Sequence, residues 1–143
     1  MISLEFRPDF INRIANSEGV REFIRPDGAA MDWAPLVSHS PAFTGTVLLS
    51  NGNDALAAFE RTAPGVYQVH TLFADTCRGR LAIETGRAML RWMFERGAQI
   101  VWGSTPRANR KACWFNRHLG ARELPTSDAT DIVFEIRRAG WAS

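Results

Sequence analysis

Residues 67–121 constrain the fold of this sequence more than any other stretch. In chain order they predict a strand, a short turn rich in glycine and arginine, a long amphipathic helix, a second strand and a helix that begins at Asn109. The long helix is the clearest element, because apolar side chains recur at helical spacing over residues 80–96 and Gly97 ends the pattern. A strand–helix–strand unit of this kind predicts one parallel crossover.

The remaining elements predict an antiparallel sheet around this unit. Apolar and alternating runs indicate strands at residues 2–6, 46–49, 55–61, 66–73, 100–102 and 132–136. Further helices are expected at residues 8–14, 20–24 and 109–119. Residues 27–44, which include Trp33 and His39, are rich in turn formers, and the C-terminal tail is expected to fray unless Trp141 docks. The predicted fold class is α+β, with a mostly antiparallel central sheet, flanking helices and one parallel crossover.

Length and composition exclude several classes of protein. The 143 residues predict one domain over residues 1–143. A composition of 45% hydrophobic and 22% charged residues is that of a soluble globule, and no apolar run approaches the roughly 20 residues that cross a bilayer. Cys77 and Cys113 are the only cysteines, which favours a reducing cytoplasm over a disulfide scaffold. A net charge of +2 gives no strong signal for nucleic acid.

The turn at Arg78, Gly79 and Arg80 could hold a phosphate group. Backbone N–H groups point outward at a helix N-terminus, the helix dipole adds partial positive charge, and a glycine lets a ligand approach the backbone. The two arginines add further charge. The alternative is a tight loop that needs glycine and whose arginines are simply solvated. The residue pattern alone leaves both hypotheses open.

Two side chains on the central strands could act as bases. His70 precedes the turn, and imidazole titrates in a range that suits removal of a proton from an amine near neutral pH. A carboxylate on the adjacent strand, such as Glu60, could do the same work through a water molecule. The alternative for His70 is a hydrogen-bonded structural role. Cys113 lies among basic residues but is expected to be buried and inert, and no cysteine or histidine pair has metal-ligand spacing, so no metal site is predicted.

The order of elements in residues 67–121 resembles the core of the GNAT acetyltransferase superfamily, in which acetyl-CoA docks where the first strand meets the long helix. The turn resembles the superfamily's Arg-Gly-Lys-Gly-x-Ala, although the second glycine is absent and the turn is one residue short. The resemblance implies that backbone groups of the preceding strand hold the pantetheine and polarise the thioester carbonyl. The cofactor-binding residues that it implies here are Leu72, Phe73, Arg78, Gly79, Arg80, Leu81 and Ala82, with Thr71 nearby.

The helix at residues 109–119 resembles a second superfamily pattern, N-x-x-A-x-x-x-Tyr-x-x-x-Gly. Asn109 and Ala112 match it, and Asn109 resembles the residue that contacts the pantetheine arm, with an N-cap as its alternative role. Phe115 is a further implied cofactor contact. The tyrosine of the pattern supplies the acid that protonates the leaving thiolate, and its position holds Asn116, whose amide cannot donate a proton in this way.

The resemblance implies an N-acetyltransferase that moves acetyl from acetyl-CoA to an unidentified amine by direct attack, with His70 and Glu60 as catalytic side chains. Residues 14–121 also resemble a GNAT-like subgroup often encoded by tailed bacteriophages, some of whose members are associated with virions. Asn116 and the short turn favour a second hypothesis, a catalytically weak GNAT-fold phage accessory or interaction protein. Residues 27–44 are expected to form the acceptor wall. A homodimer, a virion partner and a location in the host cytoplasm or the virion stay open.

Overall fold

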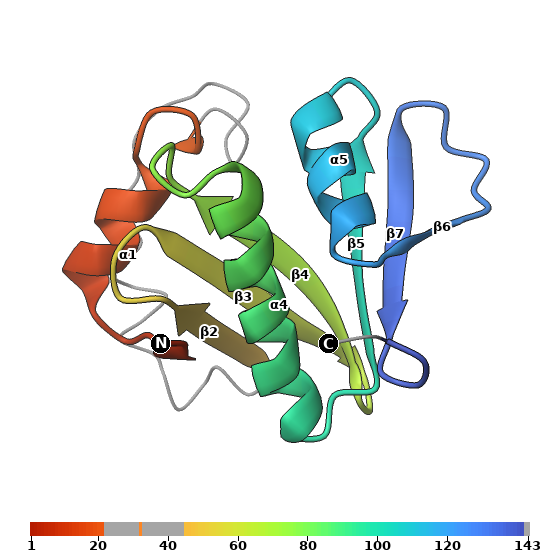
Figure 1. The fold of residues 1–143 in the computed structure, drawn as a ribbon, viewed down its shortest axis with the longest axis horizontal. Helices are drawn as coiled ribbons and strands as arrows, with labels where there is room; N and C mark the ends of the chain where they lie inside the picture. Colours follow the sequence, from red (N-terminus) through yellow and green to blue (C-terminus); the bar gives the residue numbers. More distant parts are fainter. Residues whose placement is uncertain (22–31, 33–44, 142–143) are drawn as a thin grey trace.

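The computed structural model describes residues 1–21, 32 and 45–141 (Figure 1). Its strands form one seven-stranded sheet in the order β1-β2-β3-β4-β5-β7-β6, in which β4 and β5 are parallel and the other neighbours are antiparallel. The strands are β1 (Ser3–Leu4), β2 (Thr46–Ser50), β3 (Ala55–Ala63), β4 (Val66–Phe73), β5 (Ile100–Pro106), β6 (Arg122–Leu124) and β7 (Asp131–Arg137). The helices are α1 (Pro8–Ala15), α4 (Gly79–Glu95) and α5 (Arg110–His118). The structure confirms the predicted α+β class with one parallel crossover through α4.

The two faces of the sheet bury different side chains because strand residues alternate between them. On one face the apolar stripe of α4 packs over β3 and β4, as Figure 1 shows. This core includes Ala55, Ala57, Phe59, Phe73, Met89, Leu90, Met93 and Phe94. On the opposite face Leu56 and Leu72 pack with the residues that α1 buries, Phe10, Ile11 and Ile14. The helices α1 and α4 therefore lie on opposite sides of the central strands.

Helices α4 and α5 meet at Gly86. A methyl group at this position would lie 2.9 Å from Leu119 Cδ2 and 3.0 Å from Phe115 Cζ, so only glycine fits without a shift of its neighbours. The close approach sets the height of α5 above the sheet, because Phe115 and Leu119 both come from α5 or its C-terminal end. Gly86 therefore positions α5 beside the end of β4.

Strands β4 and β5 pair over only part of their length. Their parallel ladder joins Val66, Tyr67 and Gln68 to residues 100–102 and ends at the pair Gln68–Trp102. Both strands continue, β4 to Phe73 and β5 to Pro106, without further pairing between them. The edges that face each other beyond Trp102 therefore carry backbone groups that no ladder between these two strands satisfies. This splay lies in the middle of the sheet, next to the N-terminus of α4.

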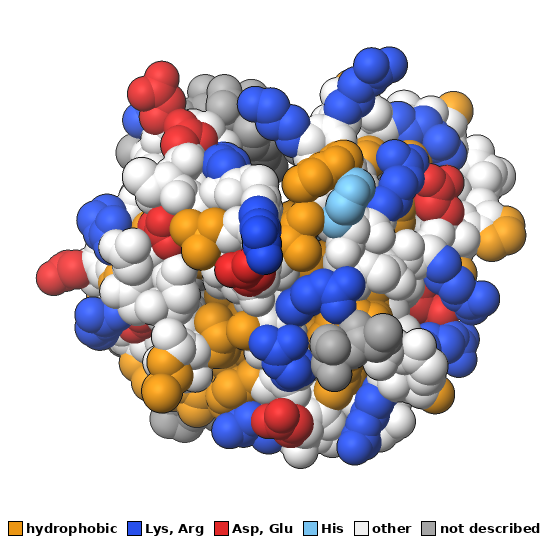
Figure 2. Space-filling model, viewed as in Figure 1, with side chains coloured by type: hydrophobic (Ala, Val, Ile, Leu, Met, Phe, Trp, Pro, Cys, Tyr) orange, Lys and Arg blue, Asp and Glu red, His pale blue; other side chains and the backbone are white. Residues whose placement is uncertain are grey.

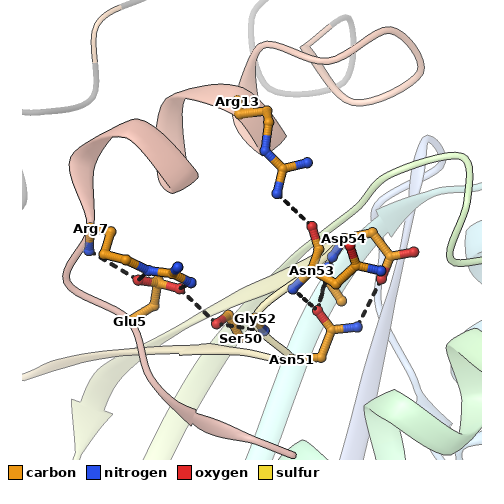
Figure 3. A network of polar contacts seen from close by, with 9 residues as sticks. Glu5, Arg7, Arg13, Ser50, Asn51, Gly52, Asn53 and Asp54 are labelled. Carbon is orange, nitrogen blue, oxygen red and sulfur yellow. Dashed lines mark hydrogen bonds and ion pairs between the residues drawn. The ribbon is translucent and has the colours of Figure 1, made fainter.

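A polar network fastens the N-terminus to the hairpin between β2 and β3 (Figure 3). Glu5, only 3% exposed, accepts hydrogen bonds from Arg7 Nη2 at 2.8 Å, from Arg7 Nε at 3.0 Å and from Ser50 Oγ at 2.8 Å. Burial alone would raise the pKa of Glu5, but the hydrogen bonds from Arg7 and Ser50 outweigh it and lower this pKa to about 2. Arg13 of α1 donates to the Asn53 carbonyl at 2.6 Å. The network therefore ties α1 to the sheet at two points.

The structure also refines several predicted elements. Strand β5 runs to Pro106, and β6 was not predicted, because three residues are too few for a periodic signal. Trp141 does dock: its indole N–H donates to the Leu119 carbonyl at 2.9 Å, and its ring meets Phe94 edge-on at 5.3 Å. The helix expected at residues 20–24 falls largely outside the described residues. The acceptor wall expected at residues 27–44, with Trp33 and His39, does so as well.

Candidate active site

The turn between β4 and α4 has the backbone of an anion site. Arg78 is the N-cap residue of α4, and no side chain caps the first turn of this helix. Gly79 adopts φ +59°, a conformation that favours glycine, and a methyl group at this position would meet nothing within 4 Å. No acidic residue lies in the first turn, so the positive end of the helix dipole is not neutralised there.

In this turn the side chain of Ala82 is buried, whereas those of the other residues are exposed. Ala82 is 5% exposed and belongs to the core, whereas Leu81 is 50% exposed. The Arg78 guanidinium donates to Asp75 Oδ1 at 3.0 Å, and Arg80, which is highly exposed, donates to Glu84 Oε1 at 3.1 Å. Both pairs are solvent-exposed and therefore weak, so a phosphate group could compete for either arginine.

Basic residues outnumber acidic residues on α4 and α5. Figure 2 shows Lys and Arg side chains along α4 and α5 on the face that these helices cover. The basic residues of the two helices are Arg80, Arg87, Arg91, Arg110, Lys111 and Arg117, against Glu84 and Glu95 as their acids. The two helices therefore carry six basic residues against two acidic ones, in a chain whose net charge is +2. Such a field attracts a polyanionic ligand.

The backbone of β4 offers donors and acceptors to the splay at alternate residues. Ala74 N–H donates to Asp54 beside β3, and the Gly65 carbonyl accepts from Gln99 and Ile100 beside β5. Because successive residues of a strand point to opposite sides, Thr71 and Phe73 direct their N–H and C=O groups toward β5. Leu72 directs its own toward Leu56 of β3. This alternation corrects the expectation for Leu72: the residue that accompanies Phe73 at the splay is Thr71.

Helix α5 supplies an aromatic contact and a cap beside the splay. The Phe115 ring meets the Phe73 ring edge-on, with the centroids 5.5 Å apart, so the two expected cofactor contacts lie together. Asn109 caps α5, its side-chain oxygen accepting from the Ala112 N–H at 3.2 Å. The cap was one of the two roles anticipated for Asn109. It uses the side-chain oxygen and leaves the amide nitrogen for a further hydrogen bond.

Asn116, which stands at the position of the superfamily's tyrosine, is hydrogen-bonded to Thr105. Asn116 Nδ2 donates to Thr105 Oγ1 of β5 at 3.0 Å. Thr105 is 8% exposed, so this contact is well shielded from solvent. Neither an amide nor an aliphatic hydroxyl ionises near neutral pH. The pair therefore fixes α5 to β5 but supplies no general acid.

His70 and Glu60 lie together on the face opposite α4. His70 Nε2 is 3.6 Å from Glu60 Oε2, and the two side chains are 51% and 58% exposed. They face the same side of the sheet because His70 pairs with Ala58, two residues from Glu60 on β3. The structure therefore brings the two sequence-derived catalytic candidates into contact.

The cysteines are structural. Cys77 is fully buried, and burial raises the pKa of its thiol, despite a hydrogen bond from the thiol to Thr85. Cys113 is 3% exposed and faces the Pro106 carbonyl. Within residues 1–21, 32 and 45–141, no three His, Cys, Asp or Glu side chains gather as metal ligands. No helix in the same part of the chain is long and apolar enough to span a membrane.

Sequence reasoning missed three residues near this site. Glycine is required at position 86 because α5 approaches closely there. The pattern of α4 alone does not reveal this contact. Thr71 was placed beside the site but not in it, although the alternation of strand residues could have identified its backbone. Trp102 stands where the β4–β5 ladder ends, and its indole N–H donates to Thr62 Oγ1 at 3.1 Å. The end of a ladder depends on tertiary packing and leaves no local signal in the sequence.

Comparisons with known proteins agree on the fold. Neither a protein-family model nor a curated protein sequence matches the chain. The spermidine N-acetyltransferase SpeG F149A mutant from Vibrio cholerae matches with a TM-score of 0.76 at 13% identity, over 99% of this chain and 96% of that one. The GNAT domain of S. lividans PAT matches with a TM-score of 0.70 at 16% identity, over 95% and 89%.

A third match is the N-acetyltransferase PseH from Campylobacter jejuni, solved in complex with acetyl coenzyme A. It has a TM-score of 0.71 at 9% identity, over 96% of this chain and 99% of that one. At these identities the likeness establishes the fold. The chain thus has the fold of the GNAT acetyltransferases, as the order of elements in residues 67–121 indicated.

Proposed function

We propose that this protein is an N-acetyltransferase that uses acetyl-CoA as donor and a primary amine as acceptor. The observation that carries the proposal is the coincidence of three features: the β4–β5 splay, the uncapped N-terminus of α4 and the His70–Glu60 pair. The first two can hold an extended chain and a diphosphate, and the third can receive a proton. Acetyl-CoA brings the activated acetyl group and the leaving thiolate.

The diphosphate is assigned to the turn at residues 78–82. The first-turn N–H groups of α4 and the φ of Gly79 form the cradle, and Arg78 exchanges Asp75 for a phosphate oxygen. The pantetheine is assigned to the splay, where Thr71 and Phe73 supply backbone hydrogen bonds. The Phe73 N–H is assigned as the donor to the thioester carbonyl, because a donor whose hydrogen bond strengthens in the transition state accelerates attack.

The acid–base work is assigned to His70 with Glu60. The amine nitrogen forms the new C–N bond, the C–S bond breaks, and the amine proton passes to His70 Nε2 directly or through a water molecule. Glu60, 3.6 Å away, stabilises the imidazolium that results. The thiolate leaves without a protein acid, since Asn116 is committed to Thr105. A thiol with an ordinary pKa of about 8.5 makes this departure acceptable.

The test is release of the CoA thiol from acetyl-CoA in the presence of a panel of primary amines. His70→Gln is expected to lower the rate by about 10²-fold or more, the usual contribution of a general base. His118→Gln is the matched control, because His118 is an exposed histidine of α5 that packs against the exposed ring of Trp114. An unchanged rate in folded His70→Gln would contradict the assigned base. Acetyl-CoA binding without thiol release from any amine would support the accessory-protein hypothesis instead.

A further inference from the structure

One row of side chains crosses the sheet face opposite α4 at the level where the splay begins. Backbone pairing aligns Glu60 of β3 with Gln68 of β4, Gln68 with Trp102 of β5, and Trp102 with Glu135 of β7. Directly paired residues present their side chains on the same face. Trp102 is therefore the aromatic group of this row, at the last paired position before β4 and β5 separate.

The indole of Trp102 is held in a defined direction. Its Nε1–H donates to Thr62 Oγ1 at 3.1 Å, and Thr62 lies two residues beyond Glu60 on β3. To reach Thr62, the side chain has to cross β4, which lies between β5 and β3. The indole therefore extends from β5 toward the strand that carries Glu60. A tryptophan fixed in this way is a rigid platform that pays little further entropy when a ligand stacks on it.

The two carboxylates of the row have different partners. Burial would raise the pKa of Glu135, but hydrogen bonds from Arg137 and Arg122 outweigh it and lower this pKa. These bonds, at 2.6 Å from Arg137 and 3.0 Å from Arg122, commit Glu135 to two cations. Glu60 has His70 as its ion-pair partner, at 3.6 Å, and remains 58% exposed. Glu60 is therefore the carboxylate of this row that can accept a cationic ligand.

We propose that Trp102 is a specificity-determining residue for the acceptor, and that with Glu60 it selects amines that arrive as alkylammonium ions. The proposal rests on the proposed acetyl transfer and names its substrate class. Tryptophan binds a cation over its ring better than any other side chain, and the carboxylate completes the recognition. The ammonium then lies beside His70: its first proton passes to solvent water to give the nucleophilic amine, and His70 takes the second proton as the C–N bond forms. Amines that are neutral in solution, such as anilines, gain neither interaction.

The test uses binding of butylammonium, measured by the indole N–H resonances of ¹⁵N-labelled protein. The Trp102 resonance, assigned by its loss in Trp102→Phe, is expected to shift with butylammonium and not with butanol. The indoles of three other tryptophans are internal controls. Trp92 lies on α4, Trp114 on α5 and Trp141 in the C-terminal tail. The proposal would be overturned if the Trp102 resonance did not shift with butylammonium at tens of millimolar, or if it shifted equally with butanol.

Variants separate recognition from folding. Trp102→Leu is expected to raise the butylammonium Kd about 3- to 30-fold, the range of a cation–π contact. Trp102→Phe should lose less affinity than Trp102→Leu, because phenylalanine keeps an aromatic face but lacks the N–H that donates to Thr62. Thr62→Val keeps the Trp102 side chain but removes the hydrogen bond that orients its indole. A several-fold loss of affinity is expected from this variant as well. Wild-type affinity in all three variants would contradict the proposal.

Acetyl-CoA binding, measured on the same samples, makes the two proposals separable. It is expected to be unchanged in Trp102→Leu, because the diphosphate turn lies on the other side of the sheet. If butylammonium binding depends on Trp102 but the protein does not bind acetyl-CoA, the result would refute the acetyl transfer and support the cation site. The reverse result would refute the cation site alone.

Discussion

Removal of the Glu5 carboxylate should weaken the attachment of α1 to the sheet by a measurable amount. The folded-state pKa of Glu5 is about 2 against an ordinary value of 4.5. At 1.36 kcal/mol per unit of pKa, this gap corresponds to about 3 kcal/mol of stability at neutral pH. Glu5 itself is 3% exposed, but its main partner Arg7 is 62% exposed, so solvent screening makes this value an upper bound. Glu5→Gln, which keeps the size of the side chain and removes its charge, should lower the free energy of unfolding by an amount of up to about 3 kcal/mol.

The sign of the pH dependence follows from the lowered pKa. The contribution of Glu5 is fully present above pH 4.5, where the carboxyl is ionised in both the folded and the unfolded chain, and it is lost as the pH falls through about 2. The stability difference between the wild type and Glu5→Gln should therefore be largest at neutral pH. It should shrink through the acid range in which the Arg7 and Ser50 hydrogen bonds are lost (Figure 3).

Urea denaturation at a series of pH values measures this difference. Glu95→Gln is the matched control, since Glu95 is 71% exposed and its ion-pair distance to Arg96 is 3.9 Å, so its loss should change little. A gap between the wild type and Glu5→Gln that is the same at neutral and acid pH would refute the assignment of the stability to the ionised carboxylate. So would a Glu5→Gln variant as stable as Glu95→Gln at neutral pH.

Three further changes test the site. Gly86→Leu should destabilise the fold by about 1–3 kcal/mol through overpacking against α5, seen as a lower thermal midpoint than in the exposed control Arg91→Leu; equal midpoints would contradict the close approach. Gly79→Ala should weaken acetyl-CoA binding by calorimetry because φ +59° strains alanine, and unchanged affinity would mean that the turn is not the cradle. Asn116→Tyr should raise thiol release by up to about 10²-fold if departure of the thiolate limits the rate, and an unchanged rate would show that it does not.

The sequence predicted those parts of the fold that depend on local patterns. Helix α4 and its stop at Gly97 follow from periodicity and a glycine, and the β2–β3–β4 meander follows from short turns between apolar runs. Asn109 as a cap was also readable, because asparagine before a helix satisfies the first-turn N–H groups. Strand β6 was not readable, since its three residues owe their conformation to pairing with β7.

The parts of the site that escaped prediction depend on contacts between distant segments. His70 and Glu60 were named separately, but their separation of 3.6 Å depends on the register of β3 and β4. Leu72 was expected at the splay because its position along the strand fits, and only the direction of its neighbours' hydrogen bonds shows that it faces β3. Trp102 lies near the site because the β4–β5 ladder ends at this residue. No residue pattern in either strand predicts where the ladder ends.

Calorimetric titration with acetyl-CoA tests the central claim most directly. The wild type should bind, and Arg78→Glu should lose roughly tenfold or more in affinity, because a carboxylate at the N-cap of α4 would repel the diphosphate. Arg91→Glu is the matched control, with the same charge change on an exposed position of the same helix, and it should bind nearly as the wild type does. Absence of heat with acetyl-CoA at millimolar concentration, or equal losses in the two variants, would contradict a donor site at this turn.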